Sequence, residues 1–192
     1  MRIGVILVFL VFSGCALLDK AGHPRKVSNL SSAGVIEHFK LEGRVSVKSE
    51  EQQSSGGLRW ERSGAGETLL LTTPLGQGVA EIRRDNGVLV LTDAEGRRQE
   101  ADDVDVLVRK TMGAPIPLGG LVYWLSARPR PGVAHVAYLD ATGRVTRLEQ
   151  EGWRIDYDRY QERGPVWLPA RLFASRREGV EFRLIVDKWE TP

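Results

Sequence analysis

The residues best suited to metal binding or nucleophilic catalysis are few and widely spaced. The chain has one cysteine, Cys15, and three histidines, His23, His38 and His135. A single cysteine excludes an intrachain disulfide and a cysteine-based zinc site, and the histidines lack the spacing of metal ligands. The sequence contains no G-x-S-x-G, H-E-x-x-H, phosphate-loop or dinucleotide-binding motif. We therefore expect no catalytic residues, no metal site and no enzymatic activity.

Charge and length narrow the function classes further. The 192 residues include 27 lysines and arginines against 25 acidic residues, and 42% of the chain is hydrophobic. The resulting formal charge of +2 is too balanced for a protein that binds nucleic acid through a phosphate-neutralising surface. The length suits one large domain, and the composition is neither that of a disordered chain nor that of a polytopic membrane protein.

The first fifteen residues combine a positive charge, an apolar run and small residues. Arg2 precedes the apolar residues 3–12, and Ser13-Gly14-Cys15 follow them. This pattern predicts a secretory signal peptide over residues 1–14, because the apolar run is far shorter than the roughly 20 residues that span a bilayer. The alternative is a short transmembrane or buried helix.

The four residues that end at the only cysteine sharpen this prediction. Phe12-Ser13-Gly14-Cys15 resembles the bacterial lipobox, with phenylalanine where leucine is usual. The resemblance implies that Cys15 carries a covalent diacylglycerol and an amide-linked acyl chain, with no further cofactor. Several acyl chains make a stable membrane anchor, where one alone is marginal. In the bacterial sorting system that this resemblance implies, aspartate after the cysteine retains a lipoprotein in the inner membrane, so Ala16 points to the outer membrane.

Residues 15–34 have the composition of a lipidated tether. They include Gly22, Pro24 and several serines, and they show little apolar periodicity. We expect a short helix over Ala33–Phe39, where the tether meets the domain. Residues 35–192 contain no internal repeat or low-complexity segment, and we expect them to form a single domain.

Apolar and polar residues alternate from Leu41 onward. Near the C-terminus, Phe182, Leu184 and Val186 alternate with charged residues, and similar patterns recur between turn signals about 8–12 residues apart. One apolar and one polar face per strand is typical of an antiparallel sheet. The sequence therefore predicts a mainly β fold built on a curved sheet or barrel.

The middle of the chain departs from this alternation. Residues 102–110 begin with Asp102, end with Lys110 and precede Gly113, which favours a helix. Pro117 opens a second predicted helix, Leu118–Ser126, with an apolar stripe. Two such helices cannot cover some ten strands, so the sheet either closes around a filled core or leaves an apolar hollow under a helical lid. The pattern leaves both alternatives open.

An apolar side chain stands at a turn between two predicted strands. Thr72–Gly78 contains a proline and two glycines, with Leu75 among them. The leucine either folds back onto the sheet or is offered to something apolar such as a bilayer. Burial of one leucine contributes about 1.5–3 kcal/mol, which is weak as an anchor but sufficient for a probe held close by lipid.

Several segments, in their order and spacing, resemble the LolB family of outer-membrane lipoproteins from about residue 38 to the C-terminus. One departure is Ser126-Ala127-Arg128, where the family often has glycine. The segments that carry the resemblance are Phe39–Val45, Leu58–Trp60, Pro74–Gln77, Ala101–Asp103, Pro115–Leu118, Leu121, Trp124–Leu125, Gly152–Tyr157, Leu168–Leu172 and Trp189.

The resemblance implies an incomplete antiparallel β-barrel of about eleven strands with a helical lid, similar to the LolA and LolB folds. It implies a monomeric receptor, anchored on the periplasmic face of the outer membrane. This receptor accepts lipoproteins from the periplasmic carrier LolA, holds their acyl chains in a hydrophobic cavity and inserts them into the outer-membrane lipid. The family's exposed loop leucine maps onto Leu75, within Pro74-Leu75-Gly76. For contact with the carrier, Arg83-Arg84 and Arg97-Arg98 are candidate patches.

The candidates for the acyl-chain cavity are the apolar residues that the alternation turns inward. Alternation gives the face of a residue but not its depth, so ordinary core is an equal alternative for each. Two rival functions remain: a lipid-anchored periplasmic scaffold or assembly factor with a filled β-core, and a lipid-anchored hydrolase. The cavity candidates are Val45, Val47, Trp60, Leu71, Ile82, Trp124, Leu125, Trp153, Ile155, Tyr157, Phe182 and Leu184.

Overall fold

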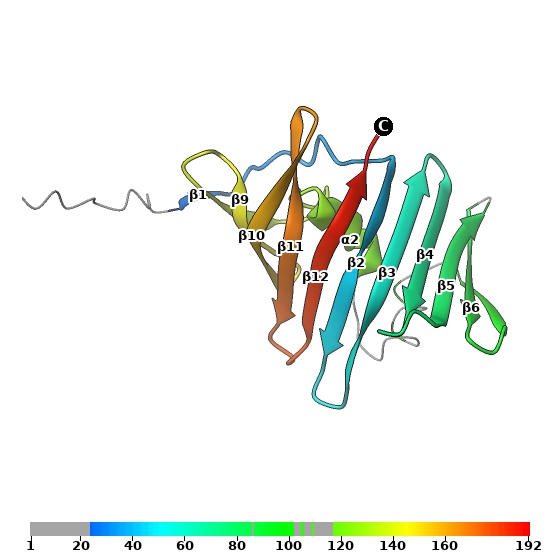
Figure 1. The fold of residues 1–192 in the computed structure, drawn as a ribbon. Coiled ribbons are helices and arrows are strands. Elements are labelled where there is room, and N and C mark those ends of the chain that lie inside the picture. Colours follow the sequence, from blue (N-terminus) through cyan, green and yellow to red (C-terminus); the bar gives the residue numbers. More distant parts are fainter. Residues whose placement is uncertain (1–23, 86, 102–104, 106–108, 110–116) are drawn as a thin grey trace, which may run out of the picture.

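The described part of the chain forms one twelve-stranded antiparallel sheet with a helix on one face (Figure 1). The computed structural model describes residues 24–85, 87–101, 105, 109 and 117–192. The strands are β1 (Arg25–Val27), β2 (Phe39–Lys48), β3 (Gln53–Ser63), β4 (Gly66–Thr72), β5 (Gly78–Asp85), β6 (Val88–Asp93), β7 (Arg98–Ala101), β8 (His135–Leu139), β9 (Val145–Gln150), β10 (Trp153–Arg163), β11 (Val166–Arg176) and β12 (Glu181–Glu190).

The strand order explains why the sheet holds together as one unit. The order is β1-β8-β9-β10-β11-β12-β2-β3-β4-β5-β6-β7. The last strand of the chain, β12, therefore pairs with β2, which lies near the start of the domain in sequence. The ends of the order, β1 and β7, do not pair with each other, and the sheet is open rather than a closed barrel. The predicted fold class is confirmed, with twelve described strands in place of about eleven. One of them, β1, comes from the segment predicted as a tether.

Alternation along the strands sets which face is buried. In β2, Leu41, Val45 and Val47 are buried, while the side chains of Glu42 and Arg44 between them are exposed. In β12, the pattern is interrupted by a bulge between Val186 and Lys188, after which Trp189 returns to the core. The apolar faces of all the long strands meet in one continuous core cluster.

Helix α2 (Leu118–Leu125) covers part of the apolar face of the sheet (Figure 1). Leu121, Trp124 and Leu125 are buried in the core cluster, as the predicted apolar stripe requires. The hydroxyl of Tyr157, on β10, donates a hydrogen bond to the carbonyl oxygen of Trp124 at 3.1 Å. This bond fixes the end of α2 to the sheet. The helix predicted over Leu118–Ser126 is therefore confirmed.

The C-terminal end of α2 places Ala127, in the segment Ser126-Ala127-Arg128, in a conformation that favours glycine. The amide of Arg128 donates to the carbonyl of Tyr123, and that of Ala127 donates to Trp124, which is the hydrogen-bond pattern of a Schellman cap. Ala127 has φ +51°, in the left-handed region where glycine is the usual residue. Ala127 therefore occupies a position at which glycine is less strained.

Two helices expected from the sequence have different outcomes. The helix over Ala33–Phe39 is wrong: residues 31–37 have no regular structure and Phe39 begins β2. The amide of Ile36 donates to the hydroxyl of Ser126 at 3.1 Å, so a tertiary contact replaces a helical hydrogen bond there. The helix predicted over 102–110 lies outside the described residues except for Asp105 and Arg109. The Asp105 carboxylate accepts a hydrogen bond from the amide of Gly119, in the first turn of α2.

Candidate functional site

The twelve residues predicted to face a cavity all belong to the buried core cluster. Each has less than a tenth of its surface exposed, and together they extend over the inner face from β5 to β10 and onto α2. Two of them, Val45 and Leu71, also line a pocket at one end of the sheet. The inner face is thus continuous and apolar, and whether acyl chains enter it stays a prediction. The twelve are Val45, Val47, Trp60, Leu71, Ile82, Trp124, Leu125, Trp153, Ile155, Tyr157, Phe182 and Leu184.

Aromatic side chains connect the elements that form this inner face. The rings of Trp124 and Trp153 lie 5.7 Å apart between centroids, which ties α2 to β10. Trp60 donates its indole N–H to the Glu67 carboxylate at 2.9 Å. Burial raises the pKa of the Tyr157 hydroxyl well above its ordinary value, so this hydroxyl remains a hydrogen-bond donor at neutral pH. The indole nitrogen of Trp124 is buried and has no hydrogen-bond partner among the described residues.

A short hydrogen-bonded turn joins β4 to β5 and carries Leu75. We call Thr73–Gln77 the Leu75 turn. The amide of Thr73 donates to the carbonyl of Gln77 at 2.8 Å, and that of Gly76 donates to the carbonyl of Thr73 at 2.9 Å. Gly76 has φ +87°, which a side chain would strain. Leu75 is 89% exposed, so it does not fold back onto the sheet, and its contact with a bilayer stays a prediction.

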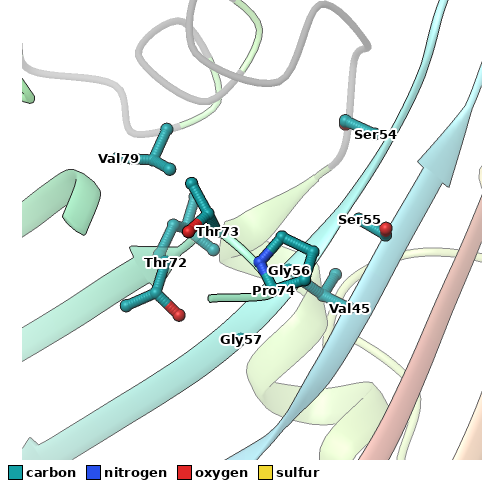
Figure 2. Close-up of a pocket in the computed structure, with 10 residues that line it drawn as sticks. Val45, Ser54, Ser55, Gly56, Gly57, Thr72, Thr73, Pro74 and Val79 are labelled. Carbon is teal, nitrogen blue, oxygen red and sulfur yellow. The ribbon is translucent and has the colours of Figure 1, made fainter. Parts of the chain in front are cut away.

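A pocket of about 150 Å³ lies beside the Leu75 turn (Figure 2). Val45 and Leu71 line it from the inner face, and Pro74 and Val79 line it from the turn and β5. It exists because β3 continues as Gln53–Gly56 beyond its last pair with β4, which is Gly57 with Thr72. The missing neighbour leaves open space at the edge of β3.

Two glycines in β3 shape this edge. A Cβ on Gly56 would lie 1.9 Å from the carbonyl oxygen of Thr72, and a Cβ on Gly57 would lie 2.5 Å from its hydroxyl. A side chain at position 56 would collide with the backbone of Thr72, so this position needs glycine, whereas at position 57 the Thr72 side chain would have to move. Sequence reasoning missed these residues, although paired glycines inside a strand are a signal of close backbone approach.

The arginines predicted to meet the carrier are mostly neutralised. Arg83 pairs with Glu81 at 2.7 Å, and Arg84 pairs with Glu67 at 3.4 Å. Arg97 pairs with Asp93 at 2.7 Å, and this hydrogen-bonded ion pair lowers the pKa of the Asp93 carboxyl. Arg98 is exposed on β7. Arg83, Arg84 and Arg97 therefore form local ion pairs and do not combine with Arg98 into one cationic surface.

Other sequence predictions fall outside the described residues or concern absences. Cys15, the predicted site of lipidation, lies outside them. Within the described ranges, no helix has the length and apolar character needed to span a membrane. No group of three potential metal-ligating side chains occurs among the same residues.

Comparisons with known proteins identify the family. A family model described as outer membrane lipoprotein LolB matches residues 37–189. An outer-membrane lipoprotein LolB from Thiobacillus denitrificans is 41% identical over 158 residues, which is 82% of each chain. Another from Dechloromonas aromatica is 34% identical over 198 residues and covers 100% of this chain and 99% of its own.

Solved structures give an independent likeness at the level of the fold. A LolA-superfamily protein from Nitrosomonas europaea has a TM-score of 0.57 at 9% identity, over 81% of this chain and 86% of its own. At that identity the likeness shows the fold alone. Sequence, fold and the open apolar sheet thus agree, and the chain belongs to the LolB family of outer-membrane lipoproteins, which serve lipoprotein localisation at the outer membrane and are not enzymes.

Proposed function

We propose that this protein accepts lipoproteins from the periplasmic carrier LolA, holds their acyl chains against the inner face of its sheet and inserts them into the outer membrane. The observation that carries the proposal is the Leu75 turn. It presents one leucine, 89% exposed, beside a pocket that opens from the apolar inner face. A bare leucine on a hydrogen-bonded turn suits contact with lipid, since burial of that side chain gains about 1.5–3 kcal/mol.

Acyl chains need an apolar surface on their way to the membrane. Each buried CH₂ contributes about 0.8 kcal/mol, so a chain of about sixteen carbons costs more than ten kcal/mol to leave in water. The inner face offers such a surface, but most of its candidate residues now contact one another. A bound chain therefore replaces some of these contacts with its own. The pocket between Val45, Leu71 and Val79 is one described opening at which it would start.

Transfer without a nucleotide must run downhill in affinity. The sequence has no phosphate-binding loop to couple the process to ATP. A ligand moves only as far as differential binding allows. Acyl chains must therefore bind this protein more tightly than the carrier, and the bilayer more tightly still. In this scheme the lipid on Cys15 keeps the domain at the membrane, and Leu75 acts at the final step.

The test is transfer of a triacylated peptide from loaded carrier to vesicles that contain the full lipidated chain. We expect transfer to exceed that to protein-free vesicles and to saturate with carrier concentration. In the same assay Leu75→Glu should lower transfer, whereas its matched control Val166→Glu should not, because Val166 is also an exposed apolar residue but lies at the end of another hairpin. Transfer equal to that of protein-free vesicles contradicts the proposal.

A second candidate function follows from the burial of the twelve inner-face residues. A filled core is what a lipid-anchored scaffold needs, and this core is continuous. The two functions differ in acyl-chain affinity. A fluorescent fatty acid displaced in a saturable manner by the triacylated peptide supports the receptor, whereas no saturable binding supports the scaffold.

A further inference from the structure

A second pocket lies at the foot of the Leu75 turn and includes residues of the outer face. Its volume is about 470 Å³. Its lining contains two arginines, Arg44 and Arg183, together with serine and threonine residues, and none of its described lining residues is acidic. Arginine and hydroxyl groups are the donors that proteins use for phosphate, because guanidinium matches two phosphate oxygens at once.

Strand register brings these groups together from distant parts of the sequence. Arg183 on β12 is paired with Ser46 on β2, which is paired with Ser55 on β3. One row along, Arg44 is paired with Gly57, which is paired with Thr72. Residues paired in this way lie on the same face of the sheet. The absent side chain of Gly57 leaves the Thr72 hydroxyl open beside Arg44.

The two arginines differ in how far their charge is neutralised. Arg44 donates to both carboxylate oxygens of Asp187, at 2.9 and 3.2 Å. Arg183 makes no ion pair with a carboxylate of the described residues, and its guanidinium carbon lies 5.1 Å from the centre of the Phe173 ring. Stacking on that ring holds the guanidinium without neutralising it. Arg183 is therefore the cation available to an anionic ligand.

The cationic pocket and the apolar pocket meet at one edge. Both are lined by Ser55, Gly56, Gly57 and Thr72, at the point where β3 extends past β4. Figure 2 shows the apolar pocket at this edge, with Val45 and Val79 among the residues that line it. One ligand that spans both must therefore carry an anionic group next to an apolar chain.

We propose that these two pockets together bind one phospholipid, with its phosphodiester at Arg183 and the first part of an acyl chain toward Val45, Leu71 and Val79. This inference rests on the proposed function, since it is Leu75 that brings the edge to a bilayer. It adds a ligand of stated chemistry to that step. A phospholipid bound at this edge would vacate its position in the bilayer. The acyl chains of the client lipoprotein would enter the bilayer at that position.

The experiment is a calorimetric titration of the full lipidated chain in a nonionic detergent with dihexanoyl phosphatidylglycerol. Dihexanoylglycerol, which lacks the phosphate, and inorganic phosphate, which lacks the chains, are titrated in parallel. We expect saturable binding of the phospholipid, and at least tenfold weaker binding of each of the other two. Loss of one charge-assisted hydrogen-bonded pair in Arg183→Gln should weaken phospholipid binding about tenfold.

Two further variants make the result specific. Arg183→Lys keeps the positive charge but cannot form the bidentate hydrogen bonds of a guanidinium, so we expect an intermediate affinity for the phospholipid. Arg98→Gln is the matched control, because Arg98 is an exposed arginine on β7 that does not line the pocket. Equal affinities of wild type and Arg183→Gln overturn the inference, and so does inorganic phosphate binding as tightly as the phospholipid. The proposed function is tested separately, by uptake of the triacylated peptide from the carrier.

Discussion

Leu75 and Trp167 are both exposed apolar side chains in turn regions of this sheet, and their surroundings differ. Leu75 is 89% exposed on a turn with no cover, next to the edge where β3 outruns β4. Trp167, in the hairpin between β10 and β11, is 44% exposed. The guanidinium of Arg144, which follows β8, lies 3.9 Å above its ring.

The difference distinguishes an apolar side chain that is fully accessible to a binding partner from one that the protein itself partly covers. Arg144 shields one face of Trp167 and gains a cation–π contact in return, which is how a protein keeps a large apolar residue at its surface. Leu75 has no such partner among the described residues, and its turn holds it outward by backbone hydrogen bonds. The comparison indicates that the Leu75 turn serves a contact outside the molecule, whereas the Trp167 hairpin serves the fold.

The largest effect should come from Leu75→Glu. A carboxylate at the turn removes the leucine's gain of about 1.5–3 kcal/mol and adds a charge that lipid excludes, so insertion of the triacylated peptide into vesicles should fall at least tenfold. Uptake from the carrier and the free energy of unfolding should stay unchanged, because the side chain contacts solvent. Urea unfolding and the two-step transfer assay measure these quantities. Insertion at the wild-type rate would remove Leu75 from the mechanism.

Trp167→Ala should have the opposite profile. Loss of the half-buried ring and of its contact with Arg144 should lower the free energy of unfolding by about 1–2 kcal/mol, measured in urea. Insertion of the triacylated peptide should remain at the wild-type rate, since this hairpin makes no lipid contact in our interpretation. A loss of insertion without a loss of stability would erase the distinction between the two sites.

The exposed tip was predictable only in part from sequence. Alternation predicted which residues of β2 and β12 are buried, because a period of two leaves no other register for an apolar face. It could not predict that β12 pairs with β2, or that β4 ends opposite Gly57, four residues after β3 begins at Gln53. These are long-range pairings, and the pockets beside the Leu75 turn depend on them. Arg183 and Gly57 therefore went unnoticed as candidates.

The helix expected over Ala33–Phe39 was also wrong because of long-range contacts that the local sequence does not reveal. Only Ala33 and Glu37 in this segment are strong helix formers, and Ile36 packs against the core and bonds to Ser126. Tertiary contacts of this kind override a weak local preference. Leu118–Leu125 met no such conflict, because its apolar stripe and its cap agree with its place on the sheet.

Two glycine substitutions compare the turns directly. Gly76 has φ +87° and Gly164, at the Trp167 hairpin, has φ +56°. Neither has an atom within 4 Å of an added Cβ, so alanine at each position should cost only the backbone strain, about 1 kcal/mol of unfolding free energy. Gly76→Ala should also slow insertion, because the turn no longer holds Leu75 outward. Gly164→Ala should leave insertion unchanged, and an equal slowing by both would contradict a specific role for the Leu75 turn.

The smallest expected effect is that of Arg144→Gln. This variant tests whether the guanidinium over the ring is the only feature that keeps Trp167, unlike Leu75, from contacting lipid. The other four tryptophans are buried, so acrylamide quenching of the fluorescence reports on Trp167. Removing the guanidinium should increase this quenching and cost about 0.5–1 kcal/mol of stability. The uncovered ring should still show no blue shift on vesicles, because it lies away from the edge that meets lipid. A blue shift would mean that Arg144 keeps a second lipid contact closed, and that cover rather than position separates the two regions.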